Sequence, residues 1–447
     1  TGNTVLEISG TDVTTGTGDA VASLRLVASS RRDDNDNGDQ AGAVYLFNTD
    51  GSNEVKIAAS DGETWDVFGS SVAAGHGKIA VGAYGDDDLG NNAGAVYVYD
   101  TDGSNEVKIT ASDAVANDQF GNRGLAIGEN KIVVGAPAEE ADGQVNYHNT
   151  GAIYVYNLDG TGEVKMTASD GAMNDNLGRS VAIGGGKVVG GASNAGHPTQ
   201  GPGAIYIYDL DGTNETKVTS SNLNQYAQFG FSVAIGENKI AVGAYQDNDG
   251  DASGYQSSGA MFLYDMDGSN EIKIMPSDRA KYDSFGWSVA IGNGKVAVGA
   301  SGPREAINVP ESNSPNGSVY VYNLDGTGEV KITASDGAAM DTFGSSVTIM
   351  NSKILVGAPM NYSGGNGAIY MYDLDGSNEV KITASDGAVG DYFGDATAIA
   401  VGSVAGNVVG GSIETTDRWT YGSDKVYNLS NNNGTPSWST SSTVIDE

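Results

Sequence analysis

Paired carboxylates recur along this chain at a spacing that could do chemistry. The members of each pair lie five residues apart, and two such acids could serve as general acid and general base. Because near-identical pairs occur in six copies and an active site is normally singular, we favour a structural role in which Asp caps turn amides. The pairs are Asp61/Asp66, Asp113/Asp118, Asp170/Asp175, Asp278/Asp283, Asp336/Asp341 and Asp386/Asp391.

A second acidic pattern could bind a hard cation. Residues 33–38 fit the opening D-x-[DN]-x-[DN]-G of a calcium loop, in which alternate oxygens surround the ion. The bidentate acid expected at the twelfth position is replaced by Val44. We therefore consider Ca²⁺ as a cofactor here and at a similar cluster further on, with a solvated polar loop as the alternative. The candidate ligands are Asp33, Asn35, Asn37 and Asp39, and then Asp247, Asp249 and Asp251.

Aromatic side chains supply the candidate binding residues. Exposed rings could stack on sugars or fill a protein interface, and the alternative is packing between neighbouring repeats. The candidates, which fall in or beside segments of variable length, are Tyr84, Tyr147, Tyr245, Tyr255 and Tyr362. The three histidines lie in different repeats and form no recognisable catalytic constellation, so we identify no catalytic residue.

Composition excludes several classes of protein. The 447 residues include no Cys, which rules out disulfides, zinc-thiolate sites and Cys nucleophiles. The chain has 57 acidic and 23 basic residues, which gives a net charge of −34. This charge disfavours nucleic acid and anionic lipid as partners. No apolar run approaches the ~18 residues of a membrane span. The start at Thr1, without a signal-like segment, leads us to expect a mature or trimmed chain.

The elements that must position these residues come from an internal repeat. A Phe-Gly pair, once Leu-Gly, returns at intervals of 50 to 58 residues, followed by Gly-Ala, a Gly-Ala-Val-Tyr-Val-Tyr type strand, Asp-Gly and a Glu-Val-Lys-Ile type strand. Each repeat thus holds four short β-branched and aromatic stretches separated by turns, with no helical period. This pattern predicts an all-β fold, a β-propeller of four-stranded antiparallel blades. The pairs begin at Phe68, Phe120, Leu177, Phe229, Phe285, Phe343 and Phe393.

The number of blades follows from counting strands. Eight second strands and eight third strands can be matched, but only seven fourth strands. The segment Thr4–Ile8 resembles the missing one, so we predict eight blades, with residues 1–12 closing the ring as a strand of the last blade. Seven blades with a spare repeat is the alternative, and Thr443–Ile445 competes for the closing role. The predicted organisation is one propeller over 1–430 and a Ser/Asn-rich tail over 431–447.

The repeat resembles a known family. Residues 385–394, and the run from Phe343-Gly344 to Gly357-Ala358-Pro359, are similar to the FG-GAP repeats of integrin α-chain propellers and of bacterial and phage surface proteins. The resemblance implies an adhesion or recognition platform outside the cell. The Asp-rich calcium loop that integrin-like repeats often carry between the first two strands is absent here, as at Gly128–Lys131, so those sites are not carried over.

Segments of variable length mark one face of the predicted ring. The spacing between the second and third strands is 12 residues at Gly82–Gly94 but 18 at Gly299–Gly317, and acidic residues collect there. In a propeller these loops share a face with the connections between blades. We therefore predict a non-enzymatic propeller, extracellular or on a cell or virion surface, that binds a glycan or protein through this acidic face. The alternatives are a self-assembling subunit of a filament, sheath, surface layer or phage appendage, and a propeller glycosidase or lyase.

Overall fold

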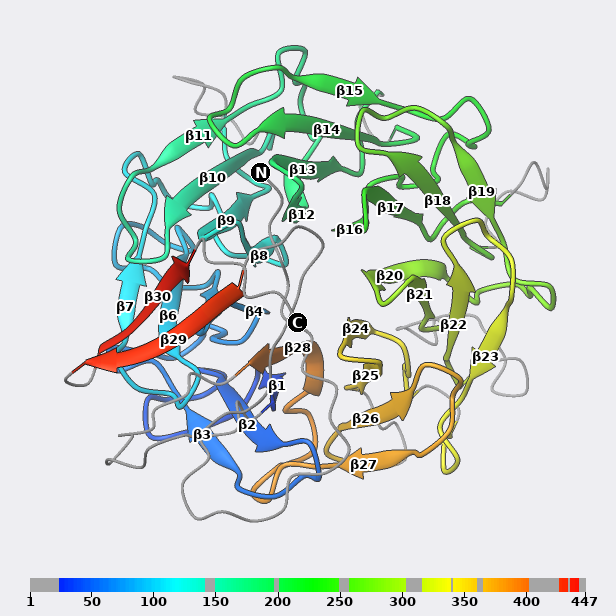
Figure 1. Ribbon diagram of the computed structural model, residues 1–447. Coiled ribbons are helices and arrows are strands. Elements are labelled where there is room, and N and C mark those ends of the chain that lie inside the picture. The colour runs from blue at the N-terminus through cyan, green and yellow to red at the C-terminus, as the bar shows by residue number, and fades with distance from the viewer. Residues whose placement is uncertain are drawn as a thin grey trace. The chain divides into compact units, whose positions relative to one another are not determined.

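The repeats form short antiparallel strands arranged as a ring (Figure 1). The computed structural model describes residues 24–140, 149–196, 201–248, 257–302, 316–338, 341–359 and 365–401, and the strand backbones at 426–432 and 435–441. The chain divides into two compact units, one of residues 24–402 and one of residues 1–23 and 403–447. The first unit holds seven four-stranded sheets, which are the blades of a β-propeller.

Each blade contains four strands in order from the centre of the ring to its rim. The innermost strands are β4 (Ser71–Gly75), β8 (Leu125–Gly128), β12 (Leu177–Gly184), β16 (Ser232–Gly236), β20 (Phe285–Gly292), β24 (Ser346–Met350) and β28 (Phe393–Val401). The second strands are β1 (Leu24–Ser30), β5 (Lys78–Ala83), β9 (Lys131–Ala136), β13 (Lys187–Ala192), β17 (Lys239–Ala244), β21 (Lys295–Ala300) and β25 (Lys353–Ala358).

The outer half of each blade is a hairpin. The third strands are β2 (Ala43–Asn48), β6 (Ala95–Asp100), β10 (Ala152–Asn157), β14 (Ala204–Asp209), β18 (Ala260–Asp265), β22 (Ser318–Asn323) and β26 (Ala368–Asp373). The fourth strands are β3 (Val55–Ile57), β7 (Val107–Ile109), β11 (Val164–Met166), β15 (Thr216–Val218), β19 (Ile272–Ile274), β23 (Val330–Ile332) and β27 (Val380–Ile382). Blade 1 is β28-β1-β2-β3, and blades 2 to 7 follow from β4–β7 to β24–β27.

The ring closes in blade 1 through a strand from the C-terminal side of the chain. β28 pairs antiparallel with β1, with Leu26 opposite Ile399 and Leu24 opposite Val401. The prediction of eight blades is therefore wrong, and the alternative of seven is confirmed. β28 takes the innermost position of blade 1, so this blade already has its four strands without a strand from residues 1–12, which lie outside the described residues.

The count of eight failed because the degenerate last repeat does not add a blade to the ring. Its predicted third strand is β29 (Val426–Asn432), which pairs with β30 (Thr435–Ser441) in a separate two-stranded sheet. The competing closing segment, Thr443–Ile445, lies outside the described residues. In the part of the chain that the structure describes, no helix is long and apolar enough to cross a membrane.

The Phe-Gly motif forms the junction between blades. Phe68 packs edge-on against Tyr97 and Tyr99, with ring centroids 5.5 and 6.2 Å apart. A Cβ on Gly82 would lie 2.2 Å from the carbonyl oxygen of Gly121, so only glycine permits this approach. The hydroxyl of Ser71 donates to the same oxygen at 2.7 Å, and this contact recurs around the ring. The inner strands are thus fixed to one another at the face where they begin.

Candidate functional site

The first Asp of each predicted pair joins neighbouring blades. Asp61, which follows the fourth strand of blade 1, accepts hydrogen bonds from the Tyr97 hydroxyl at 2.8 Å and the Lys108 ammonium at 2.9 Å in blade 2. These two partners hold the pKa of Asp61 below its usual value although burial opposes them. The same contacts are made by Asp113 with Tyr154 and Lys165, Asp170 with Tyr206 and Lys217, Asp278 with Tyr320 and Lys331, Asp336 with Tyr370 and Lys381, and Asp386 with Tyr45 and Lys56.

The second Asp of each pair caps the turn that precedes Phe-Gly. Asp66 accepts the N–H of Glu63 at 2.7 Å, and Asp118 accepts that of Val115 at 2.7 Å. The corresponding acceptors are Asp175, Asp283, Asp341 and Asp391. The predicted capping role is therefore confirmed for the second Asp of each pair, whereas the first Asp binds a tyrosine and a lysine of the next blade, and both members of a pair already have partners inside the fold.

Three of the predicted calcium ligands near residue 33 bind protein groups instead of converging on one point. Asp33 is 2% exposed, accepts a hydrogen bond from the Tyr45 hydroxyl at 2.7 Å and pairs with Lys56 at 2.9 Å. The side-chain amides of Asn35 and Asn37 donate to the carbonyl oxygens of Gly42 and Ala59 at 2.8 and 2.7 Å. Asp39 is exposed.

The second predicted calcium cluster is described only at Asp247. Its carboxylate is fully buried and pairs with Lys273 at 2.7 Å, while Asn224 donates to it at 3.0 Å. Asp249 and Asp251 lie outside the described residues. No group of three acids or histidines suited to a metal occurs among the residues that the structure describes. Calcium binding stays a prediction, and a cation at Asp33 or Asp247 would have to displace a lysine ammonium.

Two of the five candidate tyrosines are described. Tyr84 is half-buried beside β5, and Tyr245, directly after β17, packs against Phe231 and Trp287. Tyr147, Tyr255 and Tyr362 lie outside the described residues. The ring of Tyr245 therefore belongs to a cluster at the centre of the propeller.

Two members of this cluster, Phe231 and Trp287, line an open cavity of about 230 Å³ where the inner strands begin. The innermost strands surround a central channel, and we call this cavity at one end of it the channel mouth. Its lining includes residues one or two positions after each Phe-Gly or Leu-Gly pair, namely Ser70, Arg123, Arg179, Phe231, Trp287, Ser345 and Asp395. Sequence reasoning missed these residues. They could have been found from the sequence, because the residue type directly after the Phe-Gly pair differs from repeat to repeat whereas the flanking residue types recur.

Aromatic rings and guanidinium groups are in contact at the channel mouth. Ring centroids lie 4.4 Å apart for Phe231 and Tyr245, 4.7 Å for Phe231 and Trp287, and 4.9 Å for Tyr245 and Trp287. The Arg179 guanidinium lies 4.6 Å from the centroid of Phe231, and that of Arg123 lies 6.0 Å from the centroid of Trp287. Arg123 and Trp287 belong to blades 3 and 6, so their contact spans the channel.

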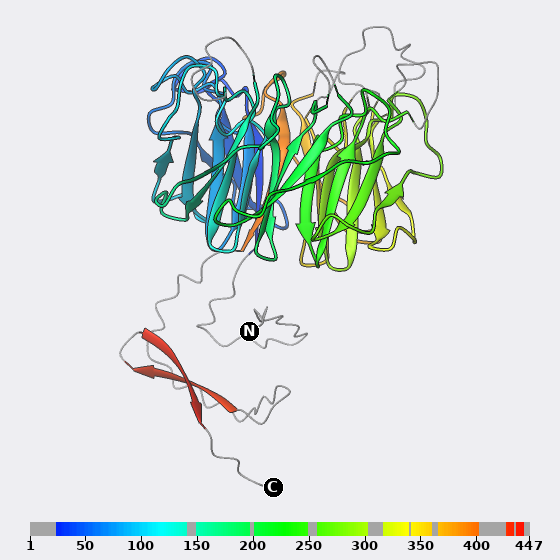
Figure 2. The same cartoon turned by 90° about the horizontal axis from the view of Figure 1, so that it is seen from above.

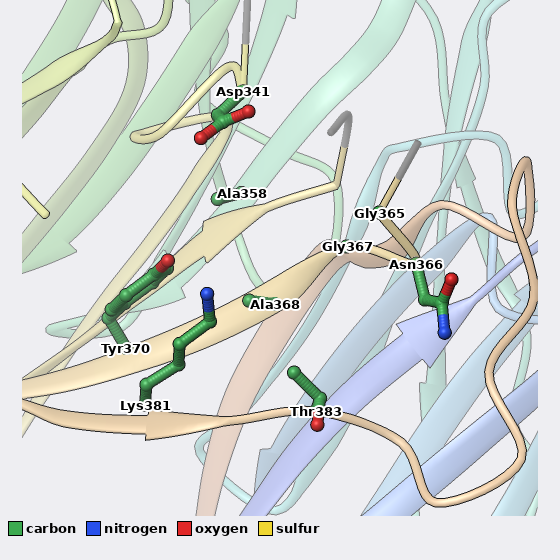
Figure 3. Close-up of a pocket in the computed structure, with 9 residues that line it drawn as sticks. All are labelled: Asp341, Ala358, Gly365, Asn366, Gly367, Ala368, Tyr370, Lys381 and Thr383. Carbon is green, nitrogen blue, oxygen red and sulfur yellow. The ribbon is translucent and has the colours of Figure 1, made fainter. Parts of the chain in front are cut away.

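A second cavity of about 230 Å³ lies in blade 7 (Figure 3). Tyr370 and Lys381 rise from β26 and β27 toward the side on which the buried carboxylate of Asp341 lies. Both residues also hydrogen-bond to Asp336, at 2.9 and 2.6 Å. In four other blades the corresponding lysine binds an additional acid from the loop after the second strand, whereas the sequence has Asn361 at that position, outside the described residues.

Exposed apolar side chains gather on the face that carries the channel mouth. They lie in the connections that precede Phe-Gly or in the loop after a second strand, and we call them the apolar rim: Trp65, Leu89, Val115, Met173, Tyr226 and Val389. Figure 2 shows the ring of blades from the side, with the strands running between its two faces. Only two other large apolar residues are exposed in the described part of the chain, Val107 and Val401, both at strand ends.

Comparison with known proteins agrees with this architecture. A family model described as FG-GAP repeat matches residues 52–99, 104–156, 161–208, 213–264, 269–322 and 327–372, which together exceed half of the chain. A search of curated proteins found no match.

Proposed function

Because the chain belongs to the FG-GAP repeat family, we propose that it is a non-enzymatic binding propeller that recognises a glycan or a protein through the face carrying the apolar rim. Propellers of this family are often binding or adhesion modules. We place the protein outside the cell, on a cell or virion surface, in keeping with the family and with a net charge of −34.

The apolar rim is the observation that carries this proposal. Trp65 is 57% exposed and Val389 is 68% exposed, although a soluble protein gains by burying such groups. Exposed apolar and aromatic side chains gathered on one face are typical of interaction sites. On the opposite face the charges are compensated locally, since lysines at the start of second strands pair with hairpin acids, as Lys78 does with Asp100 at 2.6 Å.

The repeated acids do not require a catalytic role for this face, and we propose that the face serves binding. Each capping Asp and each inter-blade Asp has a partner within the fold, as for Asp66 and Asp61. These residues are therefore explained by folding alone. The sequence positions that vary between repeats lie at the channel mouth and in the apolar rim.

A binding screen with rim variants tests the proposal. The intact protein is applied to an array of neutral, uronic-acid and sulfated oligosaccharides and to extracellular protein extracts, followed by the variants Trp65→Asn and Val389→Ser. We expect at least tenfold weaker binding of the retained ligand for the rim variants. Val107→Ser, an exposed apolar residue on an outer strand, is the matched control and should bind normally. Equal binding by all three variants would refute the assignment of this face.

A further inference from the structure

Two arginines lie within the channel mouth of a strongly acidic protein. Arg123 precedes β8, and Arg179 lies in β12, so they come from adjacent blades 3 and 4. Both line the same cavity, and both guanidinium groups lie against aromatic rings of blades 5 and 6. Against a net charge of −34, this pair forms a local concentration of positive charge.

The Arg179 guanidinium has a donor that is not used in a hydrogen bond to the described residues. Its Nε is buried and has no hydrogen-bond acceptor among the described residues, and the guanidinium lies over the face of the Phe231 ring. Burial lowers the pKa of Arg179, while Tyr245 opposes this shift. By contrast, Arg31 pairs with Asp395, which lines the same cavity, at 2.8 Å. A buried donor without an acceptor costs free energy, which an anionic ligand would recover.

The aromatic wall and the cavity size define the rest of the ligand. Phe231, Tyr245 and Trp287 present tilted rings next to the two arginines, an arrangement suited to the apolar face of a sugar ring. The cavity of about 230 Å³ is smaller than the ~300–1,000 Å³ typical of sites for drug-sized ligands. It therefore suits one sugar unit at the end of a chain better than a length of peptide.

We propose that the channel mouth binds an acidic sugar unit, whose carboxylate or sulfate pairs with Arg179 and Arg123 while its ring lies against Trp287. Guanidinium groups recognise both anions through paired, charge-assisted hydrogen bonds. The site deepens the proposed function and rests on it, since it names the ligand class for the same face. Contacts at this short range prevail over the mean negative field, which is screened beyond about 8 Å at physiological salt.

Titration with defined sugars tests the site. The probes are tetragalacturonate, its fully methyl-esterified form as the neutral control, and a sulfated galactose tetrasaccharide. Binding is followed by calorimetry and by tryptophan fluorescence, since Trp287 lines the cavity. We expect at least one acidic probe to bind at least tenfold more tightly than the neutral ester, and the preferred acidic probe identifies the anion as carboxylate or sulfate.

Variants locate the binding. Arg179→Gln and Arg123→Gln should each weaken binding of the preferred acidic probe at least tenfold, with an intermediate loss for Arg179→Lys because it keeps the charge without the planar fork. Arg279→Gln, an exposed arginine in the connection before β20, is the matched control and should bind normally. Near-ultraviolet circular dichroism and thermal unfolding confirm that each variant is folded.

Failure of this inference differs from failure of the proposed function. Equal binding of acidic and neutral probes, or unchanged binding by both arginine variants, would overturn the acidic-sugar site while leaving rim-dependent binding intact. Loss of acidic-probe binding in Arg279→Gln as well would also count against it. Absence of any ligand in the array and extract screen would instead remove the proposed function itself.

Discussion

Trp65 combines an exposed ring with a strained backbone. Its φ is +75°, a left-handed conformation that costs a non-glycine residue roughly 1–2 kcal/mol. Corresponding connections place Asn117 and Asn174 at φ of +73° and +69°, and asparagine tolerates this region better. A strained backbone conformation at an exposed aromatic residue indicates that the residue has a role other than folding.

We therefore expect Trp65→Asn to stabilise the protein by about 1 kcal/mol while weakening ligand binding at least tenfold. Urea unfolding and binding to the ligand retained in the screen provide the two measurements. Asn117→Ala serves as the opposite control, since it introduces strain at the equivalent place and should destabilise. A Trp65→Asn protein that is less stable than the parent would show that the ring contributes to folding.

Asp118 gives a pH-dependent prediction. Its carboxyl is 1% exposed, and burial, with Glu139 nearby, raises its pKa from 3.8 to about 7. An acid with a raised pKa in the folded state opposes folding when it is ionised, and this penalty disappears as the pH falls from about 7 to 4. Asp118→Asn keeps an oxygen for the Val115 N–H and removes the charge. We expect the variant to be more stable than the parent by about 1–3 kcal/mol at pH 8, and by less at pH 5.

Thermal or urea unfolding at the two pH values checks this sign. Asp113→Asn is the matched control, because hydrogen bonds from Lys165 and Tyr154 hold the pKa of Asp113 below its usual value although burial opposes them. Its ionised form therefore supports folding, and the variant should be less stable than the parent at pH 8, by an amount that shrinks as the pH falls through the lowered pKa. A stabilising Asp113→Asn, or an Asp118→Asn effect independent of pH, would contradict the argument.

Among the elements, β28 has the most demanding position. Phe393 at its start is fully buried and packs edge-on against Tyr45 and Phe47 of β2, with centroids 5.5 and 6.0 Å away. This contact joins residues from opposite ends of the described chain. Phe285 makes equivalent contacts with Tyr320 and Tyr322 within one continuous repeat.

Replacing either phenylalanine by alanine should cost about 3–5 kcal/mol, since both rings are fully buried. The two variants should differ in where the structure opens. Because β28 is held to β1 without a short connection, Phe393→Ala should raise hydrogen exchange first in β28 and β1, whereas Phe285→Ala should raise it in blade 6. Identical exchange patterns in the two variants would show that closure is no weaker than the other junctions.

The strands could be predicted from the sequence, whereas their assembly at the closure could not. β-Branched and aromatic runs bounded by Asp-Gly turns predict the hairpin β6–β7 directly, because turn and strand are local properties. Pairing of β28 with β1 depends on contacts between distant segments, and Thr4–Ile8 competes equally well on local grounds. The number of fourth strands in the sequence, seven, equals the number of blades. The counts of second and third strands were too high by one, because the degenerate last repeat was included although it adds no blade.

The site could be predicted only in part. Tyr245 was found because it follows a Gly-Ala at the edge of a variable loop. Its partner Phe231 directly precedes β16 of the same blade, where Ser232 lies opposite Gly243 of β17, whereas Trp287 lies in β20 of the next blade. The contact with Trp287 therefore depends on the assembly of the ring and not on a single repeat. The acids near residue 33 suggested a cation site because the sequence does not show that Lys56, on a different strand, reaches Asp33.

For the molecule as a whole, a repeated clasp holds the ring closed. A serine at the end of one blade binds a glutamate of the next through its N–H and its hydroxyl, as Ser112 does with Glu163 at 3.0 and 2.6 Å. The same clasp links Ser60 to Glu106, Ser169 to Glu215, Ser277 to Glu329, Ser335 to Glu379 and Ser385 to Glu54, and Ser220 binds Glu271 through its hydroxyl. The link from Ser385 to Glu54 crosses the closure, so every junction is covered.

Since residues 24–402 contain all seven blades and every clasp, we expect this fragment to fold alone. Its unfolding temperature should lie within a few degrees of that of the full chain. The fragment 24–391 keeps Ser385 but lacks β28, which leaves the buried residues of β1 exposed along an unpaired edge, so it should aggregate or unfold without a cooperative transition. Circular dichroism and light scattering after size-exclusion chromatography measure both properties. If 24–402 failed to fold while the full chain folded, closure would need a segment outside these residues. If 24–402 were a monomer while the full chain formed larger species, the missing ends would carry self-assembly, which is the alternative function for this protein.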